Sequence, residues 1–223
     1  MTTYILIPGA GGAAWYWHRL VAELGRRGHE AIAVDLPASD DRAGLPEYAD
    51  AVVAASGDHD EVVVVGQSMG GFTAPLVCDR LPVARLVLVN AMIPAPGETG
   101  GQWWTNTGQD QARREYDQRE GRSPDGPFDP LLYFFHDVPD DITKEAMAGE
   151  PPQSGTPFEQ PWPLDAWPDV PTGVLSSEGD RLFPLEFQIR VAQERLGLTP
   201  ATVPGGHLVA LSRPAELADA LDP

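Results

Sequence analysis

The chain has 223 residues, and its 15 lysines and arginines against 33 aspartates and glutamates give a formal net charge of −18. Such a charge repels phosphate backbones and anionic lipid heads, so we expect no nucleic acid and no membrane surface as a partner. With 42% hydrophobic and 22% charged residues, the composition predicts one globular domain with a sizeable core, large enough to carry an inserted lid.

The chain offers few metal or disulfide ligands. Cys78 is the single cysteine, which excludes an intramolecular disulfide framework and a cysteine-based zinc site. The histidines show no metal-ligand spacing, so we expect no metal. The amino-terminal residues do not resemble a signal peptide, and no apolar run approaches the about 20 residues that a membrane span needs. These features predict a cytoplasmic protein.

Short apolar runs alternate with helical patterns through the first half of the chain. The apolar runs predict strands at 3–7, 30–34, 62–65 and 86–89. The helical patterns cover 15–27, 47–55 and 70 to about 81. Four consecutive valines at 62–65 are typical of a strand buried on both faces of a parallel sheet. The alternation predicts an α/β fold with a mostly parallel, doubly wound sheet.

The middle of the chain interrupts this pattern. Between residues 92 and 168 the strand signals disappear, aromatic residues gather, and helical patterns cover 109–119 and 140–147. Residues 151–171 include seven prolines, so we expect an extended segment there. Strand and helix patterns then resume at 172–176, 184–196, 201–203 and 214–221. We therefore predict a core of residues 1–91 and 169–223 and an inserted, mainly helical cap of residues 92–168.

The sequence Gly66-Gln67-Ser68-Met69-Gly70 lies between a predicted buried strand and a predicted helix. In a Gly-x-Ser-x-Gly turn, the glycines allow a bend so sharp that the serine hydroxyl stands above the sheet at the start of the helix. Ser68 is therefore the candidate nucleophile.

A serine nucleophile needs a base, and the base needs a carboxylate to orient it. His207 follows the last predicted strand and is the candidate base, while Asp180 follows the preceding strand and is the candidate acid. The chain order of Ser68, Asp180 and His207 is the one expected for this topology. Glu178 is the alternative acid.

Two backbone amides are candidates for stabilising an oxyanion. One belongs to Met69, directly after the nucleophile, and the other to Ala10, in the glycine-rich loop after the first strand. This loop lacks the spacing of a phosphate-binding or dinucleotide-binding motif.

These motifs resemble the α/β-hydrolase superfamily, and the resemblance covers nearly the whole chain. Residues 15–17 (Trp-Tyr-Trp) and 35–37 (Asp-Leu-Pro) are similar to the branch that holds small carboxylesterases, plant methylesterases and hydroxynitrile lyases. The resemblance implies a Ser–His–Asp triad, no cofactor, and a helical cap over an apolar pocket. Two motifs depart from the pattern: Pro8-Gly9 replaces the frequent His-Gly, and Gln67 replaces the histidine of Gly-His-Ser.

The sequence thus predicts a serine hydrolase that cleaves a carboxylic ester of a small, largely apolar substrate. We expect Trp104, Phe135, His136 and Leu208 to line its pocket. A lyase that uses the same triad is one alternative, although the lyases that the chain resembles have a lysine where Leu208 stands. A ligand-binding or sensor protein with little turnover is the other. The sequence leaves the oligomeric state open.

Overall fold

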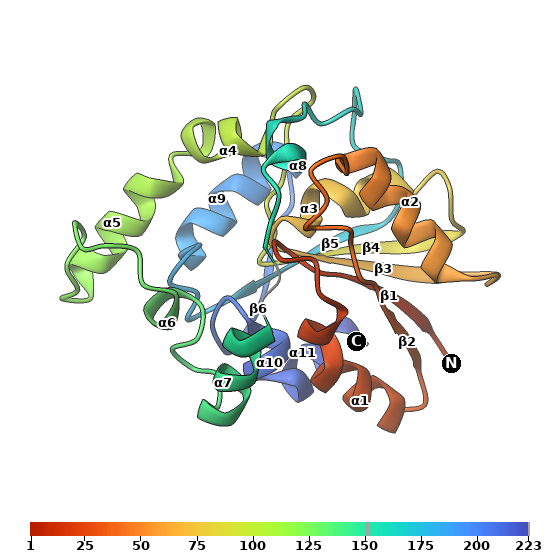
Figure 1. Cartoon of the computed structure of the whole chain (residues 1–223), viewed down its shortest axis with the longest axis horizontal. Coiled ribbons are helices and arrows are strands. Elements are labelled where there is room, and N and C mark those ends of the chain that lie inside the picture. Colours follow the sequence, from red (N-terminus) through yellow and green to blue (C-terminus); the bar gives the residue numbers. More distant parts are fainter. Residues whose placement is uncertain (150–151, 223) are drawn as a thin grey trace.

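The computed structural model describes residues 1–149 and 152–222 and contains one sheet of six strands in the order β2-β1-β3-β4-β5-β6. Every neighbouring pair of strands is parallel. In Figure 1 the strands run across the molecule, with helices above and below them. The predicted fold class is confirmed.

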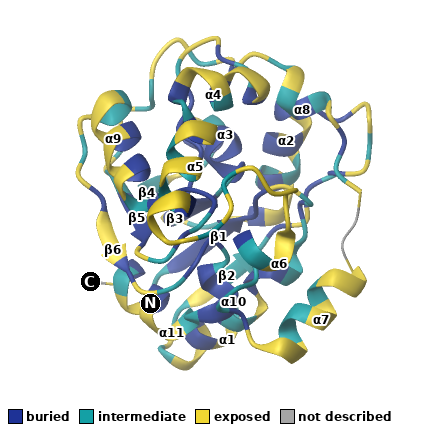
Figure 2. Ribbon diagram, turned by 90° about the vertical axis from the view of Figure 1, so that its left-hand side faces the viewer, coloured by how far each residue is buried: buried dark blue, intermediate teal, exposed yellow. Residues whose placement is uncertain are grey.

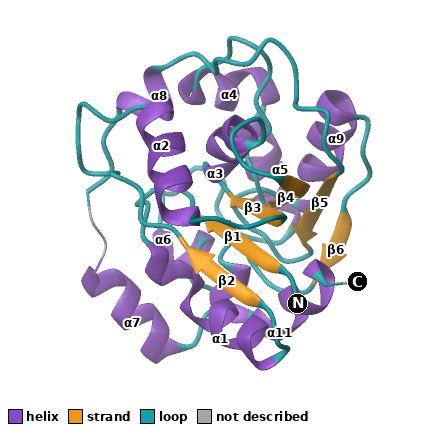
Figure 3. Ribbon diagram, turned by 90° about the vertical axis from the view of Figure 1, so that its right-hand side faces the viewer, coloured by secondary structure: helices purple, strands orange, loops and turns teal. Residues whose placement is uncertain are grey.

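The six strands coincide with the predicted apolar runs. They are β1 (Thr3–Ile7), β2 (Glu30–Ala33), β3 (Val62–Gln67), β4 (Val83–Val89), β5 (Thr172–Ser177) and β6 (Ala201–Val203). Figure 3 views the sheet from the β2 edge, where the amino terminus also lies. The chain places β2 on one side of β1 and β3 on the other, so β2 and β6 are the edge strands. The interior of the sheet consists of β1, β3, β4 and β5.

Alternating side chains divide the core between the two faces of the sheet. Ile5 and Ile7 of β1 pack on one face together with Leu88 of β4. Tyr4 and Leu6 of β1 pack on the other. Because successive strand residues point to opposite faces, continuous apolar strands supply both cores.

Helices cover both faces of the sheet. One face carries α2 (Leu45–Ser56), α3 (Gly70–Thr73) and α9 (Leu185–Leu196), and the other carries α1 (His18–Arg26), α10 (Val209–Ser212) and α11 (Pro214–Leu221). None of the helices in the described residues is long and apolar enough to cross a membrane.

The described residues between β4 and β5 form five helices. They are α4 (Gly100–Thr107), α5 (Gln109–Arg119), α6 (Pro130–Tyr133), α7 (Asp140–Gly149) and α8 (Thr156–Glu159). We call residues 92–168 the cap segment. Figure 1 shows α5, α6 and α7 on the side of the sheet where the strands end, and Figure 2 views them from that side, with exposed residues along α7.

Three predicted elements differ from the structure. The helix expected from 70 to about 81 ends as an α-helix at Thr73, because Pro75 lacks the N–H that would continue it, and a 3₁₀ turn follows at Ala74–Val77. The helix predicted at 15–27 starts with a 3₁₀ turn at Ala14–Trp17. The proline-rich stretch contains the single turn of α8, with Pro157 in its first turn. Pro151 and Pro223, which belong to predicted ranges, lie outside the described residues.

Candidate active site

Ser68, Asp180 and His207 come together at the carboxyl edge of the sheet. Ser68 directly follows β3, while Asp180 and His207 lie in the loops after β5 and β6. His207 Nδ1 lies 2.8 Å from Asp180 Oδ2, and His207 Nε2 lies 3.0 Å from Ser68 Oγ. One chain of hydrogen bonds therefore links three residues from three loops.

The partners of His207 fix its tautomer. A carboxylate only accepts hydrogen bonds, so the proton of a neutral ring resides on Nδ1, which faces Asp180. Nε2 then holds a lone pair toward Ser68 Oγ and accepts from its hydroxyl. This is the arrangement in which an imidazole can remove the serine proton.

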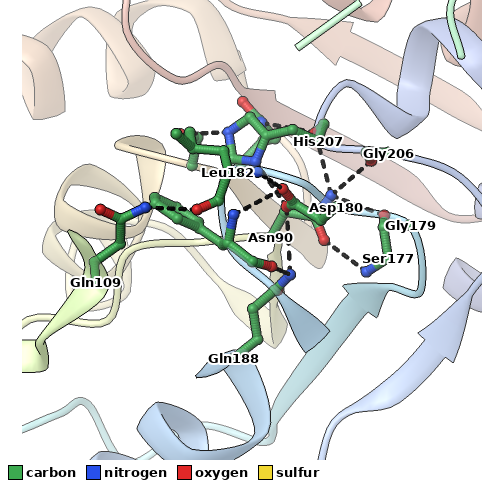
Figure 4. A network of polar contacts seen from close by, with 12 residues as sticks. Asn90, Gln109, Ser177, Gly179, Asp180, Leu182, Gln188, Gly206 and His207 are labelled. Atoms are coloured by element: carbon green, nitrogen blue, oxygen red, sulfur yellow. Dashed lines mark hydrogen bonds and ion pairs between the residues drawn. The ribbon is translucent and has the colours of Figure 1, made fainter. Parts of the chain in front are cut away.

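Asp180 is fully buried and held from several sides. Its Oδ1 accepts from the amides of Leu182 and Phe183 at 2.9 and 2.8 Å. Its Oδ2 accepts from His207 and, at 3.3 Å, from the side-chain amide of Gln188 (Figure 4). With donors on both oxygens, the carboxylate has one orientation, toward the histidine.

The turn that carries Ser68 has the strained geometry expected of its motif. Ser68 has a φ of 51°, in the left-handed region that non-glycine residues rarely occupy. A Cβ on Gly66 would lie 2.8 Å from the Cβ of Ala74, and one on Gly70 would lie 2.8 Å from the Pro8 carbonyl oxygen. The two glycines therefore permit the close packing of strand, helix and β1 loop around the serine.

The two predicted oxyanion donors belong to segments next to Ser68. Met69 is the residue before α3, and Ala10 belongs to the loop after β1 that lines the same cavity as Ser68. Among the described residues, neither amide donates a backbone hydrogen bond. Both N–H groups therefore stay candidates for oxyanion donors.

A cavity of about 740 Å³ opens above Ser68 and His207. The wall is mostly apolar, and among its described residues Glu145 and His207 are the ionisable side chains apart from the phenol of Tyr16. The described lining residues are Pro8, Gly9, Ala10, Gly11, Ala13, Trp15, Tyr16, Gln67, Ser68, Phe134, Phe135, Glu145, Ala146, Gly149, Pro152, Gln153, His207, Leu208 and Leu211.

Two of the four predicted pocket residues line this cavity and two lie outside it. Phe135 and Leu208 are in the wall. Trp104 instead packs edge-on against Trp103 and beside Phe183, within the apolar cluster under α4 and α9. His136 turns away from the cavity, because its Nε2 bonds to the carbonyl oxygen of Gly179, 3.0 Å away. Neither side chain is among the described residues that line this cavity.

The structure also separates Asp180 from the alternative acid. Glu178 is exposed, and its Oε1 accepts from the hydroxyl of Thr202 at 3.1 Å. Asp180 is the carboxylate that faces His207. Across the described residues, no group of three or more His, Cys, Asp or Glu side chains is placed to hold a metal ion.

Several residues of the site were not predicted from the sequence. Phe134 and Phe183 flank the imidazole of His207, with ring centres 5.4 and 5.0 Å away. Asn90 is buried at the end of β4 and bonds to the His207 loop. Asn90 could have been identified as a polar residue directly after a buried strand. Nothing in the sequence spacing distinguished Phe134 from the other aromatic residues of the cap segment.

The sequence pattern of the alpha/beta hydrolase family matches residues 4–220 of the chain. The chain belongs to that family. It is also 39% identical over 111 residues to the protein named "Probable esterase PIR7A" from Oryza sativa subsp. indica, and 35% identical over 104 residues to "Methylesterase 7" from Arabidopsis thaliana. These matches cover 44% and 41% of this alpha/beta hydrolase, and less than half of each relative, 42% and 40%.

Solved structures share the fold of this alpha/beta hydrolase over almost its whole length. Polyneuridine aldehyde esterase superposes with a TM-score of 0.77 at 20% identity, covering 99% of this chain and 98% of the other. A pyrethroid hydrolase from Sphingobium faniae JZ-2 gives a TM-score of 0.74 at 22% identity, covering 99% and 95%. At these identities the likeness concerns the fold.

Proposed function

We propose that this alpha/beta hydrolase is a carboxylesterase that cleaves esters of small, largely apolar substrates through the triad Ser68, His207 and Asp180. The observation that carries the proposal is the hydrogen-bond chain from Asp180 through His207 to Ser68, with separations of 2.8 and 3.0 Å, at the floor of an apolar cavity. The relatives named esterase and methylesterase support the same reaction class.

In the first half of the reaction, Ser68 Oγ attacks the ester carbonyl carbon while its proton passes to His207 Nε2. The carbonyl oxygen becomes an oxyanion, which accepts hydrogen bonds from the amides of Ala10 and Met69. The intermediate collapses, the alcohol leaves with the proton from Nε2, and Ser68 is acylated. Asp180 stabilises the imidazolium that forms between these two steps.

In the second half, a water molecule repeats the attack. It gives one proton to His207 Nε2 as its oxygen bonds to the acyl carbon, and the same amides stabilise the oxyanion. The bond to Ser68 then breaks, Oγ takes the proton back, and the carboxylic acid departs.

The cavity defines the expected substrates. Its volume of about 740 Å³ lies within the range of about 300–1,000 Å³ of small-molecule sites. Phe134, Phe135, Leu208 and Leu211 present apolar surface beside Ser68. We propose that residues 92–168 act as the cap of this pocket, since Phe134, Phe135, Glu145 and Gln153 of its wall come from that segment.

A fluorophosphonate probe together with a chain-length series of p-nitrophenyl esters tests the proposal. Wild-type protein should be labelled and should turn over at least one ester. The variant Ser68→Ala, which removes one hydroxyl from the site, should lose both labelling and turnover and keep its circular-dichroism spectrum. Near-normal turnover by Ser68→Ala would contradict the triad. Labelling of Ser68 without turnover of any ester would support a sensor instead of an enzyme.

A further inference from the structure

The cap segment bonds to the core beside two of the predicted catalytic residues and one predicted oxyanion donor. Asp137 Oδ2 accepts from the amide of Gly206, 2.8 Å away, and Gly206 precedes His207. His136 bonds to the carbonyl oxygen of Gly179, which precedes Asp180. Gln153 Oε1 accepts from the amide of Gly11, 2.8 Å away, and Gly11 follows Ala10.

The contact at Gly206 is close and largely shielded from water. The side chain of Asp137 is 14% exposed. A Cβ on Gly206 would lie 2.6 Å from Asp137 Oδ1 and 2.9 Å from His136 Nε2, so the cap segment packs directly on this backbone. An ionised acceptor makes a stronger hydrogen bond to an amide than a neutral one does. Asp137 therefore fixes the peptide that leads into the catalytic histidine.

The contact at Gly179 requires a proton on Nε2 of His136. A carbonyl oxygen only accepts, so Nε2 is the protonated nitrogen. Burial is the largest of the causes that lower the pKa of His136, and the nearby charge of Arg181 acts in the same direction. Asp137, the hydrogen bond to Gly179 and Asp180 act in the opposite direction and raise the pKa, but the net shift is downward. The ring is thus held mainly as the neutral Nε2–H tautomer, which donates to the loop of the catalytic acid.

The contact at Gly11 is held by a second set of bonds. The side-chain nitrogen of Gln153 donates to the hydroxyl of Tyr48, 3.1 Å away, and to the carbonyl oxygen of Ser154, 2.8 Å away. Tyr48 lies on α2 and is buried in the core. The amide group of Gln153 therefore has a fixed orientation, with its oxygen toward the loop that carries Ala10.

We propose that His136, Asp137 and Gln153 are positioning residues of the active site, which place His207, Asp180 and the Ala10 amide by bonding to the backbone next to each. The inference rests on the proposed function for the identity of the catalytic residues. It assigns the cap segment a part in assembling the catalytic geometry, in addition to forming the wall of the pocket. A displacement of about 1 Å in such groups can cost about 100-fold in rate.

Matched variants test the proposal, because Gln160 makes the same kind of bond as Gln153 at a different place. Gln160 Oε1 accepts from the amide of Leu45, 2.8 Å away, at the start of α2. Gln153→Met and Gln160→Met thus each remove one bond between the cap segment and a backbone amide. We expect Gln153→Met to lower kcat about 10- to 100-fold with KM within about threefold, and Gln160→Met to leave kcat within about twofold.

Asp137 offers a second pair of variants. Asp137→Ala should lower kcat over the same range, while Asp137→Asn, which keeps an oxygen acceptor for the Gly206 amide, should recover most of it. The proton NMR signal of the imidazole hydrogen bonded between His207 and Asp180 gives a readout that does not need turnover. It should shift or broaden in Asp137→Ala and stay unchanged in Gln160→Met. Urea denaturation of each variant verifies that it is folded.

Wild-type kcat and an unchanged imidazole signal in folded Asp137→Ala and Gln153→Met would overturn the proposal. An equal loss of kcat in Gln160→Met would also overturn it, because the contacts would then serve stability alone. If Asp137→Ala does not fold, the comparison of Gln153→Met with Gln160→Met decides. If the wild type hydrolyses no ester, the proposed function fails, and the NMR comparison alone decides whether these residues position His207.

Discussion

The side-chain nitrogen of Asn90 donates to the carbonyl oxygen of His207, 3.1 Å away. The same nitrogen lies 2.8 Å from Ser177 Oγ and 3.2 Å from the Gly206 carbonyl oxygen, and Asn90 Oδ1 accepts from the Ser177 amide at 2.7 Å (Figure 4). Asn90 is fully buried and has a φ of 45°, a conformation that asparagine tolerates better than most residues. One side chain thus connects the ends of β4 and β5 to the loop of His207, the proposed base.

We expect Asn90→Ala to lower the free energy of unfolding by about 2–4 kcal/mol. A buried polar group that loses its partner costs about 1–3 kcal/mol, and this variant deprives the carbonyl of Gly206 and the amide of Ser177 of theirs. The carbonyl of His207 keeps the side-chain amide of Gln67 as a donor, 3.2 Å away. Ester turnover should fall as well, since the His207 loop loses its support. Urea denaturation and kcat measure the two effects. A loss of stability below about 0.5 kcal/mol would contradict this account.

Asp180→Asn should lower kcat about 10⁴-fold, because loss of the orienting carboxylate leaves the histidine in the wrong tautomer. Glu178→Gln should stay within about twofold, since Glu178 is exposed and bonds to Thr202. Steady-state turnover of one p-nitrophenyl ester by both variants checks the ranking. The reverse ranking would transfer the role of the acid to Glu178.

We expect negligible release of cyanide from mandelonitrile or acetone cyanohydrin. Cleavage of a cyanohydrin expels an anion, which a nearby cation would stabilise, and the residue next to His207 in the cavity wall is the apolar Leu208. Lys144, the one lysine of the sequence, lies on α7 outside the described lining. A cyanide-selective assay run beside ester hydrolysis makes the comparison. Cyanide release at the rate of ester turnover, lost in His207→Ala, would favour a lyase.

The carboxylate of Glu145 predicts a preference for positively charged substrates over neutral ones. It lines the cavity from α7, and its Oε1 accepts from the indole N–H of Trp15, 2.9 Å away. Glu145→Gln should lower kcat/KM for acetylcholine about two- to fivefold relative to its neutral analogue 3,3-dimethylbutyl acetate, the size of effect typical of an exposed charge. Asp141→Asn, on the exposed part of the same helix, is the control and should leave the ratio unchanged. An equal effect of both variants would indicate that only the overall negative field acts.

The lowered pKa of His136 predicts a loss of stability in mild acid. Burial favours the neutral ring in the folded protein. Above the ordinary pKa of 6.5 both folded and unfolded chains hold it neutral, and its contribution is complete. As the pH falls below that value, the unfolded chain binds the proton first, so the contribution is lost progressively down to the folded pKa.

Urea denaturation at about pH 7.5 and about pH 5.5 measures this effect. The free energy of unfolding should fall more between the two values in the wild type than in His136→Gln. Glutamine can still donate to the Gly179 carbonyl oxygen but does not titrate, and the other histidines contribute equally to both proteins. The same pH dependence in both proteins would exclude His136 as its origin.

The strands were the part of the fold most readily predicted from sequence. β1 and β6 have the predicted bounds, and β3 extends the predicted strand by two residues. A parallel sheet buries its strands on both faces, so each strand is a continuous apolar run in the sequence. Such runs are easy to locate where they alternate with helical patterns. The helix after Ser68 was less predictable, since the effect of Pro75 on its length competed with an otherwise helical pattern.

The site was predictable to the extent that it depends on topology. Ser68, Asp180 and His207 each follow a strand, and parallel strands bring those ends together. In the cap segment, the position of a residue in the sequence does not determine whether it faces the pocket. Packing between side chains decides which of the aromatic and polar residues do. Trp104 and His136 illustrate this, since each has a partner in the core, Phe183 and Gly179, that sequence spacing did not reveal.

The hydrogen bond between Ser68 and His207 joins residues that are 139 positions apart, and His207 follows β6, which leaves the ribosome after the other five described strands. During synthesis, the serine loop therefore precedes its base by more than half of the chain. A serine hydroxyl without an adjacent base is a weak nucleophile. In the proposed mechanism, Ser68 of the growing chain is consequently inert until β6 pairs with β5 at the edge of the sheet and brings His207 to it.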